Sequence, residues 1–117
     1  MERALDSVGS RSHQLFLRYA ELELRNECIN HARNVLDRAV QLLPRVDLLW
    51  YKYVYVEELA GDIPKARAVF QRWMQWQPAD KAWLSYAKFE ERHGNLDLAE
   101  ALLRDYVNEY PTAHAFG

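Results

Sequence analysis

The sequence predicts an all-α fold: a right-handed α-solenoid of antiparallel helix pairs, with about three repeats and partial repeats at both ends. Two observations lead to this prediction. Five residue types recur at intervals of 33 or 34 residues, and no segment shows the alternation typical of a strand. The recurring positions are Phe16, Trp50 and Trp83; Tyr19, Tyr53 and Tyr86; Glu23, Glu57 and Glu90; Ala32, Ala66 and Ala99; and Pro44, Pro78 and Pro111. A period of this length indicates stacked units that are each too small to bury their own apolar face.

The second copy shows the expected plan of each repeat. Asp47 is expected to cap a first helix over residues 48–60, and Gly61 to end it in the left-handed conformation. Asp62 is then expected to cap a second helix that has Pro64 in its first turn. This helix is expected to stop at the residue before the recurrent proline.

The flanking copies follow the same plan with looser signals. In the first copy, Ser12 or His13 is expected to open a helix, and a second helix is expected over residues 29–43. In the third copy, Asp80 is expected to cap the first helix, and the second is expected over residues 96–110.

The whole chain is interpreted as a single segment of a longer protein. The predicted parts are a partial helix over 1–8, repeats over about 12–44, 46–78 and 79–111, and a truncated next repeat over 112–117. In the last of these, Phe116 stands where the next repeat would place its first large aromatic residue. Solenoids usually end in polar capping repeats, and no such repeat is visible here.

Composition narrows the class of protein. The chain has 117 residues, a net charge of −2 and 27% charged residues, so no global basic field favours nucleic acid or an anionic membrane. Cys28 is the only cysteine, which fits a reducing compartment. The start of the chain lacks a secretory signal, and no apolar run approaches the ~20 residues needed to span a bilayer. We expect a soluble intracellular protein.

Two motifs resemble a known repeat family. Trp50, Tyr53 and Glu57 give the pattern Trp-x-x-Tyr-x-x-x-Glu, and residues 66–72 read Ala-Arg-x-Val-Phe-x-Arg. These motifs resemble the half-a-TPR (HAT) repeat, known mainly from RNA-processing proteins. The segments 30–53 and 66–78, with the string Arg-Trp-Met-x-Trp-Gln-Pro, look most like the crooked neck-like family of pre-mRNA splicing factors.

This resemblance covers roughly residues 14–111 and implies a function. Family membership would make the chain a nuclear, non-catalytic scaffold of the spliceosome whose partners are other splicing factors of the Prp19-related complex. The third copy departs from the pattern. Glu100 stands where Arg33 and Arg67 stand, and Asp105 stands where Arg38 and Arg72 stand. A role that depends on those arginines is therefore in doubt for this copy.

The repeat-signature residues are interpreted as structural. They are Phe16, Tyr19, Glu23, Ala32, Arg33, Arg38, Trp50, Tyr53, Glu57, Ala66, Arg67, Phe70, Arg72, Trp83, Tyr86, Glu90 and Ala99. The aromatic rings are expected in the core between helices, opposite small alanines. The glutamates lie one repeat apart and do not converge as a catalytic pair would, so each is expected to pair with a neighbouring base, such as Arg67 or Arg72 for Glu57.

No enzyme, cofactor or metal site is predicted. The four histidines and Cys28 show neither an i, i+4 histidine pair nor a Cys-x-x-Cys motif, and phosphate-binding and nucleophile motifs are absent. Tyr51, Tyr55 and Trp76 fit the core less well and are the expected partner contacts.

Three alternatives stay open. The chain could serve another RNA-processing complex, in 3′-end cleavage or ribosomal-RNA maturation. It could bind RNA directly through a basic stripe on the second helices, although a solvated or ion-paired surface is favoured. Truncated repeat ends could also lead to self-association.

Overall fold

The computed structural model describes the backbone of residues 2–109, and these residues form helices joined by short turns, with no strand among them. The helices are α1 Glu2–Arg25, α2 Ile29–Leu42, α3 Asp47–Leu59, α4 Ile63–Met74, α5 Asp80–Arg92 and α6 Leu96–Glu109. The chain divides into two compact units, Met1–Trp76 and Gln77–Gly117. The expected all-α fold of antiparallel helix pairs is found in this part of the chain.

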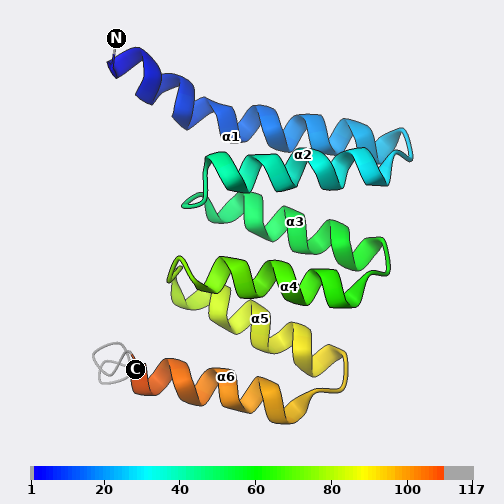
Figure 1. Cartoon of the computed structure of the whole chain (residues 1–117), viewed down its shortest axis with the longest axis vertical. Helices are drawn as coiled ribbons and strands as arrows, with labels where there is room; N and C mark the ends of the chain where they lie inside the picture. The colour runs from blue at the N-terminus through cyan, green and yellow to red at the C-terminus, as the bar shows by residue number, and fades with distance from the viewer. Residues whose placement is uncertain (1, 110–117) are drawn as a thin grey trace. The chain divides into compact units, whose positions relative to one another are not determined.

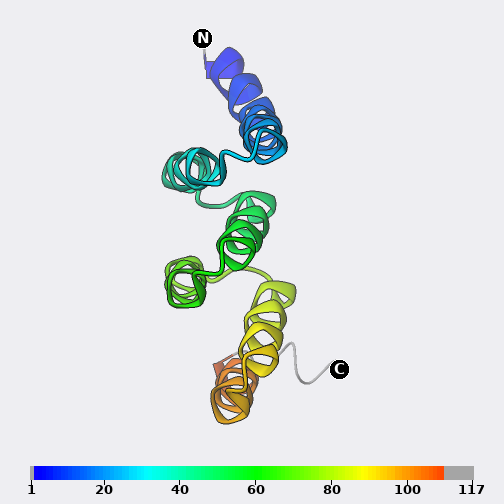
Figure 2. The same cartoon turned by 90° about the vertical axis from the view of Figure 1, so that its right-hand side faces the viewer.

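The first unit holds two helix pairs, α1 with α2 and α3 with α4. Consecutive helices run antiparallel, and their turns lie at alternate ends (Figure 1). In the perpendicular view, α1 and α3 form one layer and α2 and α4 form the other (Figure 2). Helix α3 contacts both α1 and α2, so the second pair covers the first. The core lies between these layers, where Leu36, Val56 and Val69 are fully buried.

The second unit holds the third helix pair. Helices α5 and α6 pack against each other as an antiparallel hairpin (Figure 1). Ala82, Tyr86 and Phe89 on α5 are at most 3% exposed, and Ala99 on α6 is 8% exposed. The three-residue and four-residue spacing of the α5 residues is the apolar stripe of an amphipathic helix.

The three turns inside the helix pairs share one backbone geometry. The amide of the residue after the turn donates to the carbonyl of the signature glutamate: Cys28 to Glu23 at 2.8 Å, Asp62 to Glu57 at 3.0 Å and Asn95 to Glu90 at 2.8 Å. A bond of this reach, next to a residue with positive φ, is the Schellman ending of a helix. In these three turns the residues with positive φ are Glu27 at 61°, Gly61 at 79° and Gly94 at 85°.

Several predicted helix ends need correction. Helix α1 runs without a break from Glu2, so the expected short helix over 1–8 and the new start at Ser12 or His13 are wrong. No proline interrupts residues 8–12, and a lone glycine costs a helix only about 1 kcal/mol. Asp47 and Asp80 are the first residues of their helices, and the N-cap positions belong to Val46 and Ala79.

Helix α4 ends at Met74, before the expected Gln77, which has a positive φ of 52° and so cannot continue the helix. The signals at the start of α4 agree with the structure. The Asp62 carboxylate accepts a bond from the Lys65 amide at 3.3 Å, and Pro64 lies in the first turn of α4. The predicted ends at Tyr110 and Pro111, and the truncated repeat over 112–117 with Phe116, lie outside the described residues. None of the described helices is both long enough and apolar enough to cross a membrane.

Candidate functional site

An aromatic cluster joins α3 to α4. Trp50 is 1% exposed, and its ring lies parallel to that of Trp73, with centroids 6.1 Å apart and 5° between planes. The indole nitrogen of Trp50 donates to the Pro44 carbonyl at 2.8 Å, and that of Trp73 donates to Asp47 Oδ1 at 3.2 Å. Tyr51, expected at a partner surface, is half-buried with its ring edge-on to Trp73 at 4.7 Å. These rings hold helices together and form no open row for a ligand.

The equivalent rings of the other copies are less covered. Phe16 and Trp83 are both half-buried, and Trp83 lies 6.0 Å from Tyr106 of α6. Ala32 and Ala66, the small signature residues of the first unit, are fully buried. Small side chains at these positions let neighbouring helices approach closely.

A buried carboxylate ties the second helix pair to the first. Glu57 of α3 is fully buried, and its Oε1 lies 2.8 Å from Arg33 Nη2 of α2. The same guanidinium nitrogen lies 3.0 Å from Asp62 Oδ2, and Nη1 donates to Asn30 Oδ1 at 3.3 Å. The contact with Glu57 raises the pKa of Arg33 against the lowering effect of burial. We call Arg33, Glu57 and Asp62 the arginine clamp.

A second polar contact lies one turn further along α2. Asp37 Oδ1 accepts from the Tyr53 hydroxyl at 2.9 Å and from Arg72 Nη1 at 2.9 Å. Burial alone would raise the pKa of Asp37, but the bonds from Arg72 and Tyr53 outweigh it and hold that pKa below its ordinary value. For the Tyr53 hydroxyl, by contrast, burial and the bond to Asp37 both raise the pKa. Asp37 therefore links α2 to both α3 and α4.

The ion-pair partner that the sequence predicted for Glu57 is wrong. Arg67 or Arg72 of the same copy was the expected base, whereas Arg33 of the preceding copy holds Glu57 and Arg72 serves Asp37. Sequence reasoning missed Asp37 because its repeat equivalents are Gln71 and Arg104, so it gives no periodic signal.

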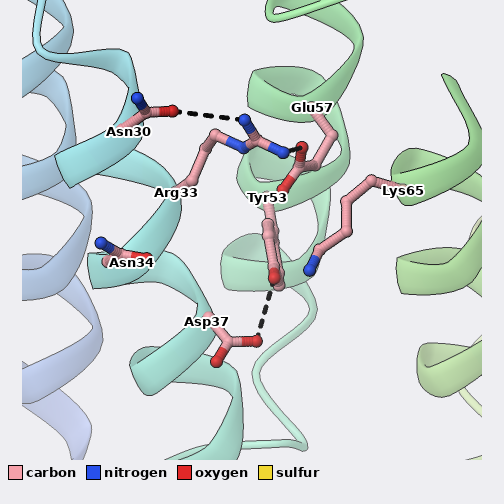
Figure 3. A pocket seen from close by; sticks show the side chains of 7 residues that line it. All are labelled: Asn30, Arg33, Asn34, Asp37, Tyr53, Glu57 and Lys65. Atoms are coloured by element: carbon pink, nitrogen blue, oxygen red, sulfur yellow. Dashed lines mark hydrogen bonds and ion pairs between the residues drawn. The ribbon is translucent and has the colours of Figure 1, made fainter. Parts of the chain in front are cut away.

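Arg33 and Glu57 of the clamp line an open pocket of about 340 Å³ between α2, α3 and α4 (Figure 3). The lining residues are Asn30, Arg33, Asn34, Asp37, Tyr53, Glu57 and Lys65. Lys65 reaches into the pocket from α4 beside the Tyr53 ring (Figure 3). Both pocket carboxylates already contact an arginine, so the pocket offers polar contacts rather than an acid–base pair tuned for catalysis.

The three signature glutamates stay at separate turns, as their spacing predicts. Glu57 belongs to the arginine clamp, and Glu90 Oε1 accepts from Asn95 Nδ2 at 2.8 Å. Glu23 Oε2 lies 3.0 Å from His31 Nδ1. Glu23 and Glu90 thus each contact a side chain in or just after their own turn, and Glu57 contacts an arginine of the preceding pair.

The first turn also gathers a set of metal-ligand types that sequence reasoning overlooked. One ligand atom each from Glu23, Cys28 and His31 lies within 4.8 Å of the other two. The sequence argument considered histidine pairs and Cys-x-x-Cys alone. The sequence signal that could have revealed this set is Cys28-x-x-His31 at the start of a helix, preceded by a glutamate near the end of the helix before it.

One face of α1 is apolar and exposed. Leu15, Tyr19 and Leu22 are 70%, 54% and 43% exposed. Their equivalents on α3 are at most 1% exposed, and α3 packs against the first pair: Leu49, Tyr53 and Val56. The exposed face of α1 thus carries large apolar residues at the positions that α3 uses to pack against the first helix pair.

Two of the predicted partner contacts are exposed aromatic rings, each with a basic side chain lying over the ring. Tyr55 is 52% exposed, with Lys52 Nζ 5.4 Å from its ring centroid, and Lys52 also lies 3.7 Å from Glu21 of α1. Trp76 is 42% exposed, with the Arg45 guanidinium 5.4 Å from its ring. Such cation–aromatic pairs keep the rings ordered at the surface.

The basic residues of the second helices are largely engaged. Arg33 and Arg72 contact carboxylates, while Arg38 is exposed. At the equivalent positions of the third copy, Glu100 and Asp105 are exposed acids. This distribution differs from the row of free cations that binds a phosphate backbone.

Comparison with known proteins gives a family match over nearly the whole chain. Residues 1–112 match the family described as the pre-mRNA-splicing factor Syf1/CNRKL1 N-terminal HAT repeat. The matched range includes all six helices described above.

Individual relatives agree with this match. The pre-mRNA-splicing factor cwf4 of Schizosaccharomyces pombe is 49% identical over 82% of this chain and 14% of its own length. The crooked neck-like protein 1 of Dictyostelium discoideum is 46% identical over 92% of this chain and 17% of its own length. The chain therefore spans less than a fifth of these relatives.

Proposed function

Because the chain belongs to the N-terminal HAT-repeat family of the Syf1 and crooked neck-like splicing factors, we propose that it is a non-catalytic interaction scaffold of the spliceosome. In this role it acts in pre-mRNA splicing and spliceosome assembly within the nucleus. The observation that carries the proposal is the family match over residues 1–112, to which relatives named as splicing factors add support.

The polar contacts between the helices support the role of a scaffold. The arginine clamp and Asp37 fix the distance between helix pairs, and their carboxylates are already held by Arg33 and Arg72. A scaffold needs this rigidity because it must hold several partners in fixed relative positions.

We place the partner surface on the exposed aromatics Tyr55 and Trp76. Aromatic residues beside a cation are enriched where proteins bind each other. Tyr51 belongs to the same proposal as a supporting residue, since its ring lies against Trp73. The partners are other splicing factors of the Prp19-related complex.

The apolar face of α1 has a different role in the proposal. Leu15, Tyr19 and Leu22 repeat the residues with which α3 covers α1 and α2, so a further helix pair of the same design would bury them. This supports the interpretation of the chain as one segment of a longer repeat protein.

Affinity purification from nuclear extract tests the proposal. A full-length protein containing this segment should recover spliceosomal proteins, and Tyr55→Ala with Trp76→Ala should reduce the recovery of specific partners. Leu84→Ala is the matched control, since Leu84 is also exposed, at 44%, but belongs to the second unit. Recovery of 3′-end cleavage or ribosomal-RNA maturation factors in place of splicing proteins would contradict the assignment.

The salt dependence of RNA affinity distinguishes direct RNA binding from the scaffold proposal. Binding through arginines would weaken steeply as salt rises, because each neutralised phosphate releases counterions. The engaged state of Arg33 and Arg72 leads us to expect no such binding at micromolar protein. A steep negative salt slope in fluorescence anisotropy would favour the RNA-binding alternative instead.

A further inference from the structure

The geometry points to a zinc site at the α1–α2 turn, formed by the Glu23 carboxylate, the Cys28 thiolate and the His31 imidazole. One ligand atom from each residue lies within 4.8 Å of the others, and Glu23 Oε2 is already 3.0 Å from His31 Nδ1. Tetrahedral zinc with ligands at about 2.0–2.3 Å requires ligand atoms about 3.3–3.7 Å apart. Small side-chain rotations close that difference, and His31 is free to make them because its side chain is 67% exposed.

The ligand types select zinc among common cations. A thiolate and an imidazole suit Zn²⁺ and disfavour Mg²⁺ and Ca²⁺, which prefer oxygen ligands. One thiolate and one carboxylate also neutralise the two charges of the ion. Three protein ligands leave a fourth position, which water can occupy.

The fold itself does not account for Cys28. The residue holds the N-cap position of α2, yet its side chain makes no capping bond; its thiol instead lies 3.6 Å from the Asn26 carbonyl. At the same position of the next copy, Asp62 caps α4 through the Lys65 amide. Replacing a good cap costs about 1 kcal/mol of helix stability. A residue that breaks a local rule without a structural gain indicates a functional position.

The other copies lack this ligand set. Where the first copy has Cys28 and His31, the second has Asp62 and Lys65. The third copy has Asn95 and Leu98 at these positions. The three turns share their backbone hydrogen bonds, so the difference lies in side chains alone. The same comparison supplies test variants, because Asp and Lys occupy these positions in a turn with the same backbone hydrogen bonds.

Cobalt titration of the reduced chain tests the site. Co²⁺ should bind with one ion per chain, give an intense near-ultraviolet thiolate-to-cobalt band, and be displaced by Zn²⁺. Cys28→Asp, which installs the second-copy cap, should abolish the band. His31→Lys should weaken zinc affinity at least about tenfold, since loss of even an outer partner of a ligand costs about 10-fold to 100-fold.

Two controls keep the result decisive. His13→Gln removes a histidine far from the turn and should leave the titration unchanged. Thermal unfolding without metal should show that Cys28→Asp and His31→Lys remain folded, while added zinc should raise the midpoint of the unchanged chain more than that of either variant. Absence of the thiolate band, or equal zinc affinity in the unchanged chain and both variants, would overturn the proposal.

Discussion

At the scale of single residues, the three turns provide an internal comparison. Glu27 has a φ of 61° where the other copies have Gly61 and Gly94. A residue with a Cβ pays about 1–2 kcal/mol in this conformation, and glycine does not. The backbone of the first turn is therefore strained at Glu27.

Glu27→Gly should raise the free energy of unfolding by about 0.5–1 kcal/mol, because relief of the left-handed strain exceeds the extra entropy lost by glycine. Urea denaturation followed by circular dichroism measures the change. Glu27→Ala removes the side chain but keeps the strain, so it should give no comparable gain. A stabilisation as large in the alanine variant would point to the side chain instead.

The arginine clamp permits a second prediction. Arg33→Met leaves the fully buried Glu57 without its base and should cost about 3 kcal/mol. Adding Glu57→Met removes the stranded charge and should recover much of that loss, as measured by a double-mutant cycle. Arg38→Met on the same helix is exposed and should change stability by less than about 0.5 kcal/mol. Additive effects of the Arg33 and Glu57 substitutions would mean that the two side chains are not coupled.

At the scale of elements, the aromatic cluster holds α3 to α4. Trp50→Ala should destabilise the chain by about 3–5 kcal/mol, because the ring is 1% exposed and the cavity left behind cannot collapse fully. Trp76→Ala, which truncates an exposed ring in the turn after α4, should cost well under half as much. Chemical denaturation of both variants provides the measurement, and equal losses would contradict the assigned core.

The contact of Asp37 with Tyr53 and Arg72 should make the packing of α2 on α3 and α4 sensitive to acid. The folded-state pKa of Asp37 lies below its ordinary value of 3.8, so its contribution is present above pH 3.8 and is lost as the pH falls through the folded-state value. Asp37→Asn should cost about 1 kcal/mol at neutral pH, a discounted value because both charged partners are partly exposed.

The measurement is the difference in unfolding free energy between the unchanged chain and Asp37→Asn. It should shrink as the pH drops below 3.8. Tyr53→Phe keeps the Arg72 contact and should therefore retain part of this pH dependence. A difference that stays constant from neutral to acidic pH would show that the charge on Asp37 contributes nothing.

Sequence reasoning reached the helix pairs but not the contacts between them. The period of the chain fixes which residues share a register, and Gly61, Asp62 and Pro64 mark helix ends through local chemistry. The base that faces Glu57 depends on which helix of the preceding copy lies opposite, and no local rule supplies that. Asp37 lacked a periodic signal altogether. Long-range polar pairing is thus the part that required coordinates.

At the scale of the whole molecule, the exposed face of α1 should govern the behaviour of the isolated chain. Leu15, Tyr19 and Leu22 form an apolar surface that favours association. Sedimentation should reveal concentration-dependent self-association, and Leu15→Glu with Tyr19→Glu should weaken it at little cost in stability. Leu84→Glu, at an exposed leucine outside this face, is the control. A self-association constant equal in all variants would place the contact elsewhere.

The position of the arginine clamp also determines where the polypeptide can be divided. Its ionic joint connects α2 of the first copy to α3 of the second, so a cut between the two motifs also severs this contact. Cleavage between Pro44 and Asp47, the natural motif boundary, would separate Arg33 from Glu57 and strand a carboxylate in the interior. A fragment that starts at the turn before α2 keeps both halves of the joint, and truncation studies of this chain should begin there.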